Sequence, residues 1–337
     1  MKQSLQSLWP WGIALIGCAL LSSLFYPSIN PYYQTIFIVA AINITLAVSL
    51  NLINGFTGQF SLGHAGFMAV GGYTSAALTF YILPTLGLSE VPTQLFFLVA
   101  ILCGGILAAV GGYLVGLPSL RLKGDYLAIV TLGFGEIIRV ILLNVNSLGG
   151  ARGLTGMQAL TNQHWVVFVA LVATFSVARL IGTPAGRAML SVREDEVAAG
   201  AMGVDTTRTK VKAFVMGAFW AGVAGALYGH YYGYLNPSNF TFMKSFEVIV
   251  IIVLGGLGSV SGAILAAILL TILPEALRPL QEITKIDFRM IIYSLILIMF
   301  MLLKPEGLLG RQELGPWLLR HYRHFRKKFS PKTETSS

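Results

Sequence analysis

The polar side chains that interrupt the hydrophobic part of this chain are the first candidates for chemistry. The stretch NGFTGQFSLGHAGF, residues 54–67, places Gln59, Ser61 and His64 among glycines. Unwound backbone inside a membrane is tolerated only where protein or a water-filled cavity surrounds it, and polar groups at that depth are usually functional. The pattern therefore predicts a broken helix near 54–63 whose three polar side chains line a translocation path. The alternative is a polar turn in which His64 caps a helix.

Two other polar pairs lie in hydrophobic stretches. Asn43 and Asn51 are eight residues apart, so a helix carries them on one face. Two roles fit these asparagines. One is lining the translocation path, and the other is hydrogen bonding between helices. Glu136 and Arg139 have the i,i+3 spacing of a helical ion pair and can neutralise each other in an apolar segment. We expect a structural ion pair there, and the alternative is a proton relay.

Catalytic and metal-binding patterns are absent from the sequence. It contains no G-x-x-x-x-G-K-[ST] phosphate loop and no H-E-x-x-H metal motif. Cys18 and Cys103 lie in hydrophobic runs without C-x-x-C spacing, which argues against a metal site or a disulfide framework. We therefore expect that the chain is not an enzyme and binds no cofactor. Energy for transport must then come from another polypeptide or from an ion gradient.

The composition identifies the elements that position these residues as membrane-spanning helices. Of 337 residues, 55% are hydrophobic and 11% are charged, and the mean hydropathy is +0.74. The net charge of +9 comes from Lys and Arg between and after the hydrophobic runs, which is typical of cytoplasmic loops rather than of a nucleic-acid-binding surface. A spanning helix needs about 20 mainly apolar residues. The candidate spans are 9–26, 33–53, 62–82, 94–117, 125–146, 164–182, 211–232, 246–273 and 288–304.

Basic residues predict the orientation of these spans, because they mark the cytoplasmic side. The basic clusters are Arg121 with Lys123, residues 182–212, and the tail 311–337. All three basic clusters are cytoplasmic only if 246–273 crosses the membrane an even number of times. This segment then forms two short crossings or a re-entrant hairpin, with a break at Gly255–Ser259. The prediction is an all-α polytopic membrane protein of about ten membrane segments, with broken or re-entrant helices near 54–63 and 246–273. Both termini are expected in the cytoplasm.

We divide the chain into a transmembrane domain, 1–310, and a basic cytoplasmic tail, 311–337, that contacts anionic lipid. The longest polar interval inside the first domain is 182–212, called the polar segment below. Ser191 and Glu194 have the spacing of a capping box, which predicts a helix start there. Gly203 can close this helix after about three turns. An ordinary connecting loop is the alternative.

Three ordered motifs give the chain a likeness to a known family. They are GFTGQFSLGHAGFMAVGGY from Gly55 to Tyr73, RLKGDYLAIVTLGFGE from Arg121 to Glu136, and VREDEVAAGAMGV from Val192 to Val204. Together they resemble the permease subunits of branched-chain amino-acid ABC importers, and within that family the M-type permease. The related urea permeases share much of the pattern. The resemblance extends from the second span to Leu308.

The resemblance implies a bacterial plasma-membrane importer of branched-chain or other neutral amino acids. Such a permease pairs with a paralogous second permease and binds two cytoplasmic ATPases that hydrolyse ATP, while an external solute-binding protein delivers substrate. The ATPase-docking loops of ABC importers have a pattern near E-A-A-x-x-x-G, and here Val197 separates the glutamate from the alanines. The residues expected to dock the ATPase are Ser191, Arg193, Glu194, Glu196, Ala198, Ala199 and Gly203.

Two alternative functions remain open from the sequence. One is a urea or small-amide permease of the same class. The other is a secondary transporter driven by protons or sodium, with Glu136 or His64 as the coupling group.

Overall fold

The computed structural model describes residues 30–87, 90–119, 125–278, 289–310 and 313. The predicted span 9–26, the basic pair Arg121 and Lys123, and almost all of the tail 311–337 lie outside these residues. Within them, six helices are long and apolar enough to cross a membrane. The prediction of an all-α polytopic membrane protein is thus confirmed for the described residues, whereas the count of about ten membrane segments stays a prediction.

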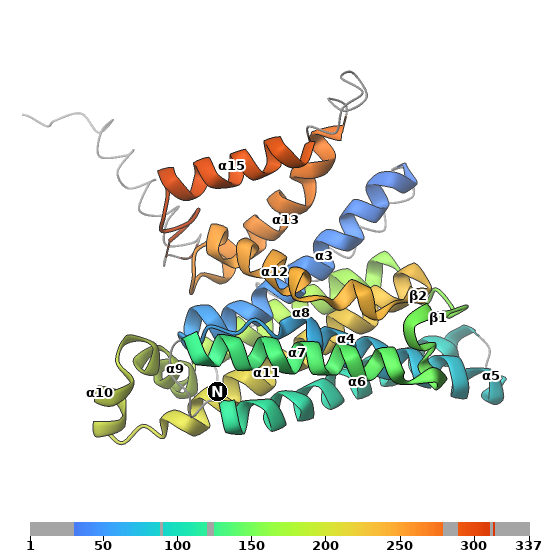
Figure 1. Ribbon diagram of the computed structural model, residues 1–337, viewed down its shortest axis with the longest axis horizontal. Coiled ribbons are helices and arrows are strands. Elements are labelled where there is room, and N and C mark those ends of the chain that lie inside the picture. The colour runs from blue at the N-terminus through green and yellow to red at the C-terminus, as the bar shows by residue number, and fades with distance from the viewer. Residues whose placement is uncertain (1–29, 88–89, 120–124, 279–288, 311–312, 314–337) are drawn as a thin grey trace, which may run out of the picture.

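The α-helices form the bundle in Figure 1. They are α3 (Pro31–Asn51), α4 (His64–Ala77), α5 (Leu83–Leu86), α6 (Glu90–Ser119), α7 (Asp125–Asn144), α8 (Gln163–Ile181), α9 (Pro184–Glu194), α10 (Glu196–Ala201), α11 (Thr206–Tyr232), α12 (Phe242–Gly255), α13 (Val260–Ala276) and α15 (Arg289–Leu303). Two π-helices, η2 (Leu52–Phe56) and η3 (Leu78–Ile82), continue α3 and α4. Short 3₁₀ turns are η4 (Asn146–Leu148), η5 (Gly150–Arg152) and η6 (Pro237–Phe240).

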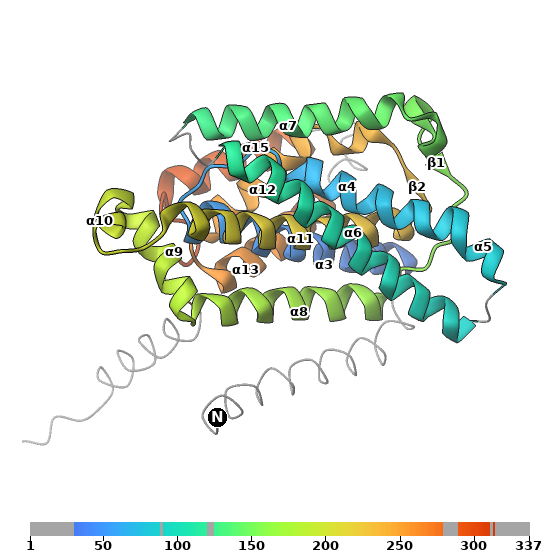
Figure 2. The same ribbon diagram turned by 90° about the horizontal axis from the view of Figure 1, so that it is seen from below.

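Helix α11 occupies the middle of the bundle. It is mostly buried and packs against α6, α4 and α3, while α7 and α8 lie on opposite outer sides in Figure 2. A Cβ at Gly71 of α4 would overlap the backbone of Gly222 in α11, and one at Gly72 would press on Gly225. Small residues therefore allow the close helix approach that is usual in membranes.

The two ends of the bundle carry different structures. Helices α9 and α10 project at one end, and α5 with a short β-ladder lies at the other (Figures 1 and 2). The ladder, which the sequence did not predict, joins β1 (Leu154–Thr155) to β2 (Tyr234–Leu235) in antiparallel register. It ties the segment after α7 to the segment after α11.

Both predicted breaks are confirmed. After η2 the chain is irregular up to Gly63, α4 begins at His64, and residues 256–259 separate α12 from α13. Helices α12 and α13 have 14 and 17 residues, so they are about 21 and 26 Å long. Each is shorter than the hydrocarbon core of about 30 Å, which agrees with two short helices in place of one long span.

The starts of α11 and α12 were predicted too late. Helix α11 begins at Thr206 rather than 211, because the Asp205 carboxylate accepts a hydrogen bond from the amide of Arg208 and caps the helix. Helix α12 begins at Phe242 rather than 246, directly after the η6 turn. The first turns of both helices thus contain polar residues. A hydropathy window leaves such residues out, and the predicted start therefore falls later in the sequence.

Candidate functional site

The polar segment contains two short helices, and the capping box predicted there is wrong. Helix α9 begins after Thr183, whose hydroxyl accepts from the amide of Gly186. Ser191 therefore lies inside α9, where its hydroxyl donates to the carbonyl of Ala188. A second start follows at Asp195, whose carboxylate accepts from the amides of Val197 and Ala198 and caps α10. The charged Asp195 carboxylate accepts hydrogen bonds from two amides, so it is a stronger helix cap than the Ser191 hydroxyl would be. The second helix therefore begins after Asp195.

Helix α10 closes as predicted but presents a different face. Gly203 has φ +85°, a left-handed conformation that suits glycine, and the amide of Val204 bonds to the carbonyl of Ala199 in a Schellman-type end. Val197 is 73% exposed and Met202 is 84% exposed, whereas Ala199 is buried against this chain. The exposed residues of α10 and its C-cap are Val197, Ala198, Gly200, Ala201 and Met202, and Ala199 is not among them.

Glu196 also points back into the protein. Its carboxylate lies 2.6 Å from Nζ of Lys210 in α11, and the side chains are 30% and 8% exposed, respectively. The lysine is buried and carries a formal charge, so it needs this partner. The pair fastens α10 to the first turns of α11.

Arg193 connects the polar segment to the first broken helix. Its Nη1 donates to the carbonyl oxygen of Gly55 in η2 at 3.0 Å, and Glu194 holds the other side of the guanidinium at 2.7 Å. The Arg193 side chain is 17% exposed. Its backbone and Cγ lie so close to Gly58 that a Cβ there would meet them at 2.9–3.4 Å, and its guanidinium adjoins Gly258. Arg193 contacts both breaks, and its predicted contact with an ATPase stays a prediction.

The two breaks themselves meet at Asn51. Its amide nitrogen donates to the carbonyl of Ser259 at 2.8 Å, and its oxygen accepts from the amide of Gly258 at 3.0 Å. Gly55 packs directly on Gly258, where neither position has room for a side chain. We call Asn51, Gly55, Gly258 and Ser259 the junction. Because Arg193 contacts its two glycines, the polar segment and both breaks form one connected structure.

Glu313, at the start of the predicted tail, also reaches the second break. Its carboxylate accepts from the amides of Val260 and Ser261 at 2.8 and 3.0 Å, and from the hydroxyl of Ser261. These are the first amides of α13, so Glu313 caps that helix from a distant part of the chain.

The asparagines of α3 act between helices. The Asn43 amide donates to Oγ1 of Thr271 in α13 at 3.0 Å, and Asn51 makes the junction contacts. Both are buried. The structure thus confirms hydrogen bonding between helices for both, and their role in a path stays a prediction.

The three polar residues of the first break are buried with unused hydrogen-bonding groups. His64 Nε2 lies 2.9 Å from the Ser49 hydroxyl, which itself donates to Leu46, so Nε2 is the donor. Among the described residues, both side-chain polar atoms of Gln59, the Ser61 hydroxyl and His64 Nδ1 have no hydrogen-bond partner. His64 does not cap α4, so the capping role is wrong, and the role of the three residues in a path stays a prediction. Buried polar groups without partners are costly and point to a functional rearrangement or bound water.

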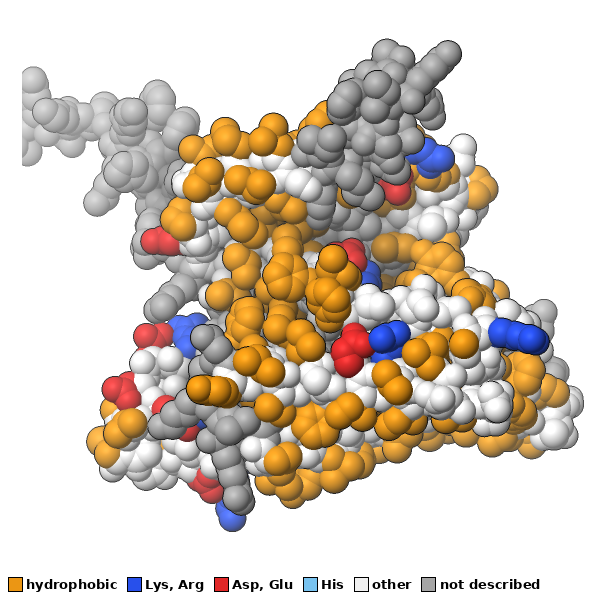
Figure 3. Space-filling model, viewed as in Figure 1, with side chains coloured by type: hydrophobic (Ala, Val, Ile, Leu, Met, Phe, Trp, Pro, Cys, Tyr) orange, Lys and Arg blue, Asp and Glu red, His pale blue; other side chains and the backbone are white. Residues whose placement is uncertain are grey.

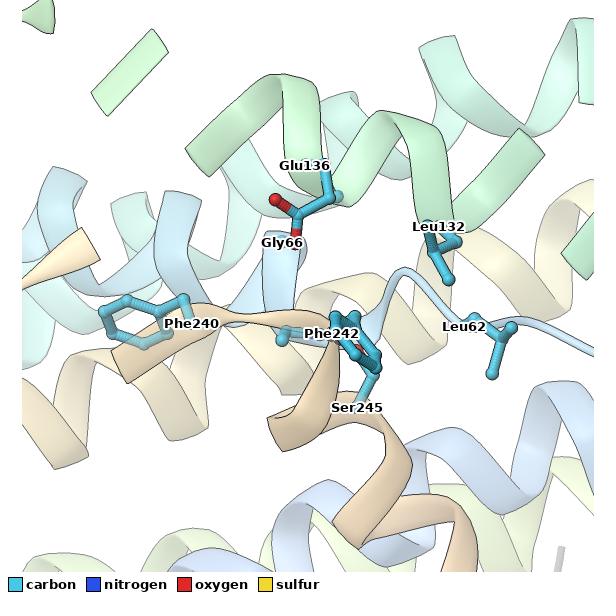
Figure 4. A pocket seen from close by; sticks show the side chains of 9 residues that line it. Leu62, Gly66, Leu132, Glu136, Phe240, Phe242 and Ser245 are labelled. Carbon is cyan, nitrogen blue, oxygen red and sulfur yellow. Dashed lines mark hydrogen bonds between the residues drawn. The ribbon is translucent and has the colours of Figure 1, made fainter. Parts of the chain in front are cut away.

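The Glu136–Arg139 ion pair is confirmed, with Nε of Arg139 2.7 Å from Oε2 of Glu136. The side chains are 30% and 26% exposed, respectively, midway along α7. A small, partly open hollow lies beside Glu136, between α4, α7 and α12. Its lining includes Leu62, Leu132, Phe240, Phe242 and Ser245 (Figure 4).

Four contact residues of this site were missed from the sequence. Thr183 followed by Pro184 is a recognisable helix start, since proline favours the first helical position. Asp195 is also a typical cap residue. Lys210 and Glu313 gave no local signal, because Lys210 pairs with a residue of another helix and the partners of Glu313 are far away in the sequence.

Broken helices buried in an apolar bundle, with unused polar groups at a break and a helical polar segment at one end, define a polytopic membrane permease. The chain belongs to the family described as branched-chain amino acid transport system / permease component, which matches residues 32–303.

Two LivM proteins, described as high-affinity branched-chain amino acid transport system permease proteins, are similar to this chain. The one from Salmonella typhimurium is 36% identical over 303 residues, and the one from Escherichia coli is 37% identical over the same length. Each match covers 80% of this chain and 68% of the relative. The Escherichia coli LivH permease is 28% identical over 289 residues, covering 80% of this chain and 91% of the relative. No solved structure matches the chain.

Proposed function

We propose that this chain is the M-type permease subunit of an ATP-driven importer of branched-chain amino acids in the bacterial plasma membrane. Its family and its similarity to the LivM proteins support the substrate class. The observation that carries the mechanism is the hydrogen bond from Arg193 to Gly55. It links a segment suited to a soluble partner with a broken helix inside the bundle.

The exposed face of α10 receives the ATPase in this proposal. Val197, Ala198 and Met202 form a small apolar surface at the end of the bundle, and α10 itself is capped and held by the Glu196–Lys210 pair. A helix fixed in this way moves as a unit with α9 and the first turns of α11. ATP is bound and hydrolysed by the two partner subunits, and this chain contributes no nucleotide site.

Arg193 and the junction then carry the movement inward. A shift of α9 displaces the Gly55 carbonyl through Arg193, and Asn51 transfers the displacement to the start of α13. The polar groups of Gln59, Ser61 and His64, unpaired in this conformation, gain partners when the break rearranges. Coupling of this kind requires that the junction contacts differ in strength between the two states of the transporter.

The other partners follow from the same proposal. A paralogous permease completes the transporter, since the chain is similar to both LivM and LivH proteins. An external solute-binding protein approaches the end that carries α5 and the β-ladder, opposite α9 and α10. Both termini are cytoplasmic in this orientation.

The test is reconstitution with the second permease, the two ATPases and the binding protein in proteoliposomes. We expect the ATPases to co-purify with this chain and leucine-loaded binding protein to stimulate hydrolysis and uptake. Leucine uptake that persists without ATP and collapses with the ion gradient would contradict the proposal. Preferential uptake of urea would replace the substrate while retaining the ATP-driven class.

A further inference from the structure

The second break creates two helix ends whose backbone groups need partners. Helix α12 ends at Gly255 and α13 begins at Val260. The last carbonyl groups of a helix and its first amide groups have no partner inside that helix. Gly255, Ser259 and Val260 are buried, and hydrophobic side chains gather over α12 and α15 on the face shown in Figure 3. The free groups at this break must therefore be bonded within the protein.

The segment that follows α15 supplies partners to both helix ends. The amide of Leu308 donates to the carbonyl of Leu254 at 2.7 Å, and the amide of Leu309 donates to the carbonyl of the next residue of α12 at 3.3 Å. The Glu313 carboxylate accepts from the first two amides of α13 at 2.8 and 3.0 Å. One segment thus bonds to the end of α12 and to the start of α13. We call residues 307–310 together with Glu313 the splint.

Glycines allow the splint to lie directly on the break. Gly256 has φ +106° and Gly307 has φ +85°, which are conformations that residues with a side chain rarely adopt. A Cβ at Gly256 would lie 2.3 Å from the carbonyl oxygen of Gly310, and one at Gly307 would lie 2.6 Å from the amide nitrogen of Gly256. The two backbones are therefore in contact, which fixes the splint against both helices.

The start of α13 has one cap from its own sequence and one from the splint. The Ser259 hydroxyl accepts from the amide of Gly262 at 3.1 Å, while Asn51 of the junction donates to the Ser259 carbonyl. Glu313 bonds to the amides of Val260 and Ser261, which lie between these two contacts. A carboxylate at this position also interacts favourably with the positive end of the helix dipole. Removal of Glu313 would thus loosen α13 directly beside the junction.

We propose that Glu313 is a positioning residue for transport, and that the splint holds α12 and α13 in a fixed relation across the second break. The junction passes its displacement to the start of α13. If that start could shift freely, it would absorb the displacement, whereas with Glu313 bound α12 and α13 respond together. The transport role rests on the proposed function, but the bonding across the break does not depend on it.

The experiment uses the complete importer in proteoliposomes and compares three variants. Glu313→Ala removes both acceptor oxygens from the start of α13. Glu313→Gln keeps one acceptor oxygen but removes the charge. Glu306→Ala is the matched control, because Glu306 also follows α15 and is exposed, and among the described residues its carboxylate makes no hydrogen bond to the break.

The direct readout is hydrogen exchange of the peptide that contains Val260 and Ser261, measured by mass spectrometry on the purified complex. We expect exchange about tenfold faster in Glu313→Ala, because two charge-assisted hydrogen bonds are lost. The functional readout is leucine uptake per ATP hydrolysed. It should fall about tenfold in Glu313→Ala and less in Glu313→Gln, with hydrolysis within about twofold of wild type. Glu306→Ala should equal wild type in both readouts.

Each readout can overturn its own part of the inference. Unchanged exchange in Glu313→Ala would refute the splint. Faster exchange with an unchanged ratio of uptake to hydrolysis would refute the positioning role, since a cap that is only structural leaves that ratio intact. If Glu313→Ala does not assemble, Glu313→Gln decides by the same two readouts, and no change in either would refute the inference.

Failure of the proposed function gives a different result. Wild-type complex whose ATP hydrolysis does not respond to leucine-loaded binding protein would contradict that function, and the transport role of Glu313 with it. The exchange measurement would still support or refute the splint, because it needs neither ATP nor substrate.

Discussion

Replacing Arg193 with glutamine removes the hydrogen bond between the polar segment and Gly55. The donor is charged, its side chain is 17% exposed, and the bond is 3.0 Å long, so its loss costs about 1.5–3 kcal/mol. If this hydrogen bond forms in only one of the two states of the transporter, its loss lowers the coupling constant between ATP hydrolysis and transport roughly 10- to 150-fold. We expect the complex to assemble and to hydrolyse ATP while leucine uptake per ATP drops at least tenfold.

The assay measures uptake and hydrolysis in the same proteoliposomes and reports their ratio. Arg208→Gln is the matched control, because Arg208 also lies in the polar segment and pairs with a nearby carboxylate, yet its side chain is exposed. Its ratio should equal that of wild type. An unchanged ratio in Arg193→Gln would refute the reasoning, and so would an equal loss in Arg208→Gln.

Three further predictions concern the junction and α10. Gly55→Ala should lower the thermal unfolding temperature of the purified complex, because a Cβ there overlaps the Asn51 side chain and overpacking costs about 1–3 kcal/mol; an unchanged melting curve would contradict this. Lys210→Met should destabilise the complex by about 1–3 kcal/mol through the unpaired Glu196, and adding Glu196→Gln should recover part of that loss in denaturant unfolding. Asp195→Ala removes the cap of α10, which should destabilise this helix by about 1 kcal/mol and weaken ATPase binding roughly fivefold in titrations. Asp195→Asn is the control, because asparagine keeps the cap. Equal ATPase affinities in both variants would show that the cap is unimportant.

Much of the fold follows from local properties of the chain. A hydrophobic run of sufficient length becomes a membrane helix because every backbone group must be bonded within it, and the described helices lie where those runs were found. The breaks near 54–63 and 256–259 were also predictable, since glycine weakens a helix wherever it stands. The Glu136–Arg139 pair needed only helical spacing.

The start of the helices in the polar segment was mispredicted because several local signals compete. Thr183, Ser191 and Asp195 can each cap a helix, and spacing alone does not rank them. The structure uses the first and third. Ser191 then bonds within α9, as serine does when a helix has already formed around it.

Local properties of the chain specify a polytopic helical protein, its two broken helices, and a polar segment suited to a soluble partner. Which residues connect these parts depends on how the helices pack. Arg193 and Gly55 are far apart in the sequence, and Glu196 and Lys210 lie in different helices, so no local pattern pairs them. Their meeting depends on how α9 and α11 pack against the bundle, which is a property of all the contacting surfaces together. For the same reason the burial of Ala199 and the inward direction of Arg193 could not be read from the residues around them.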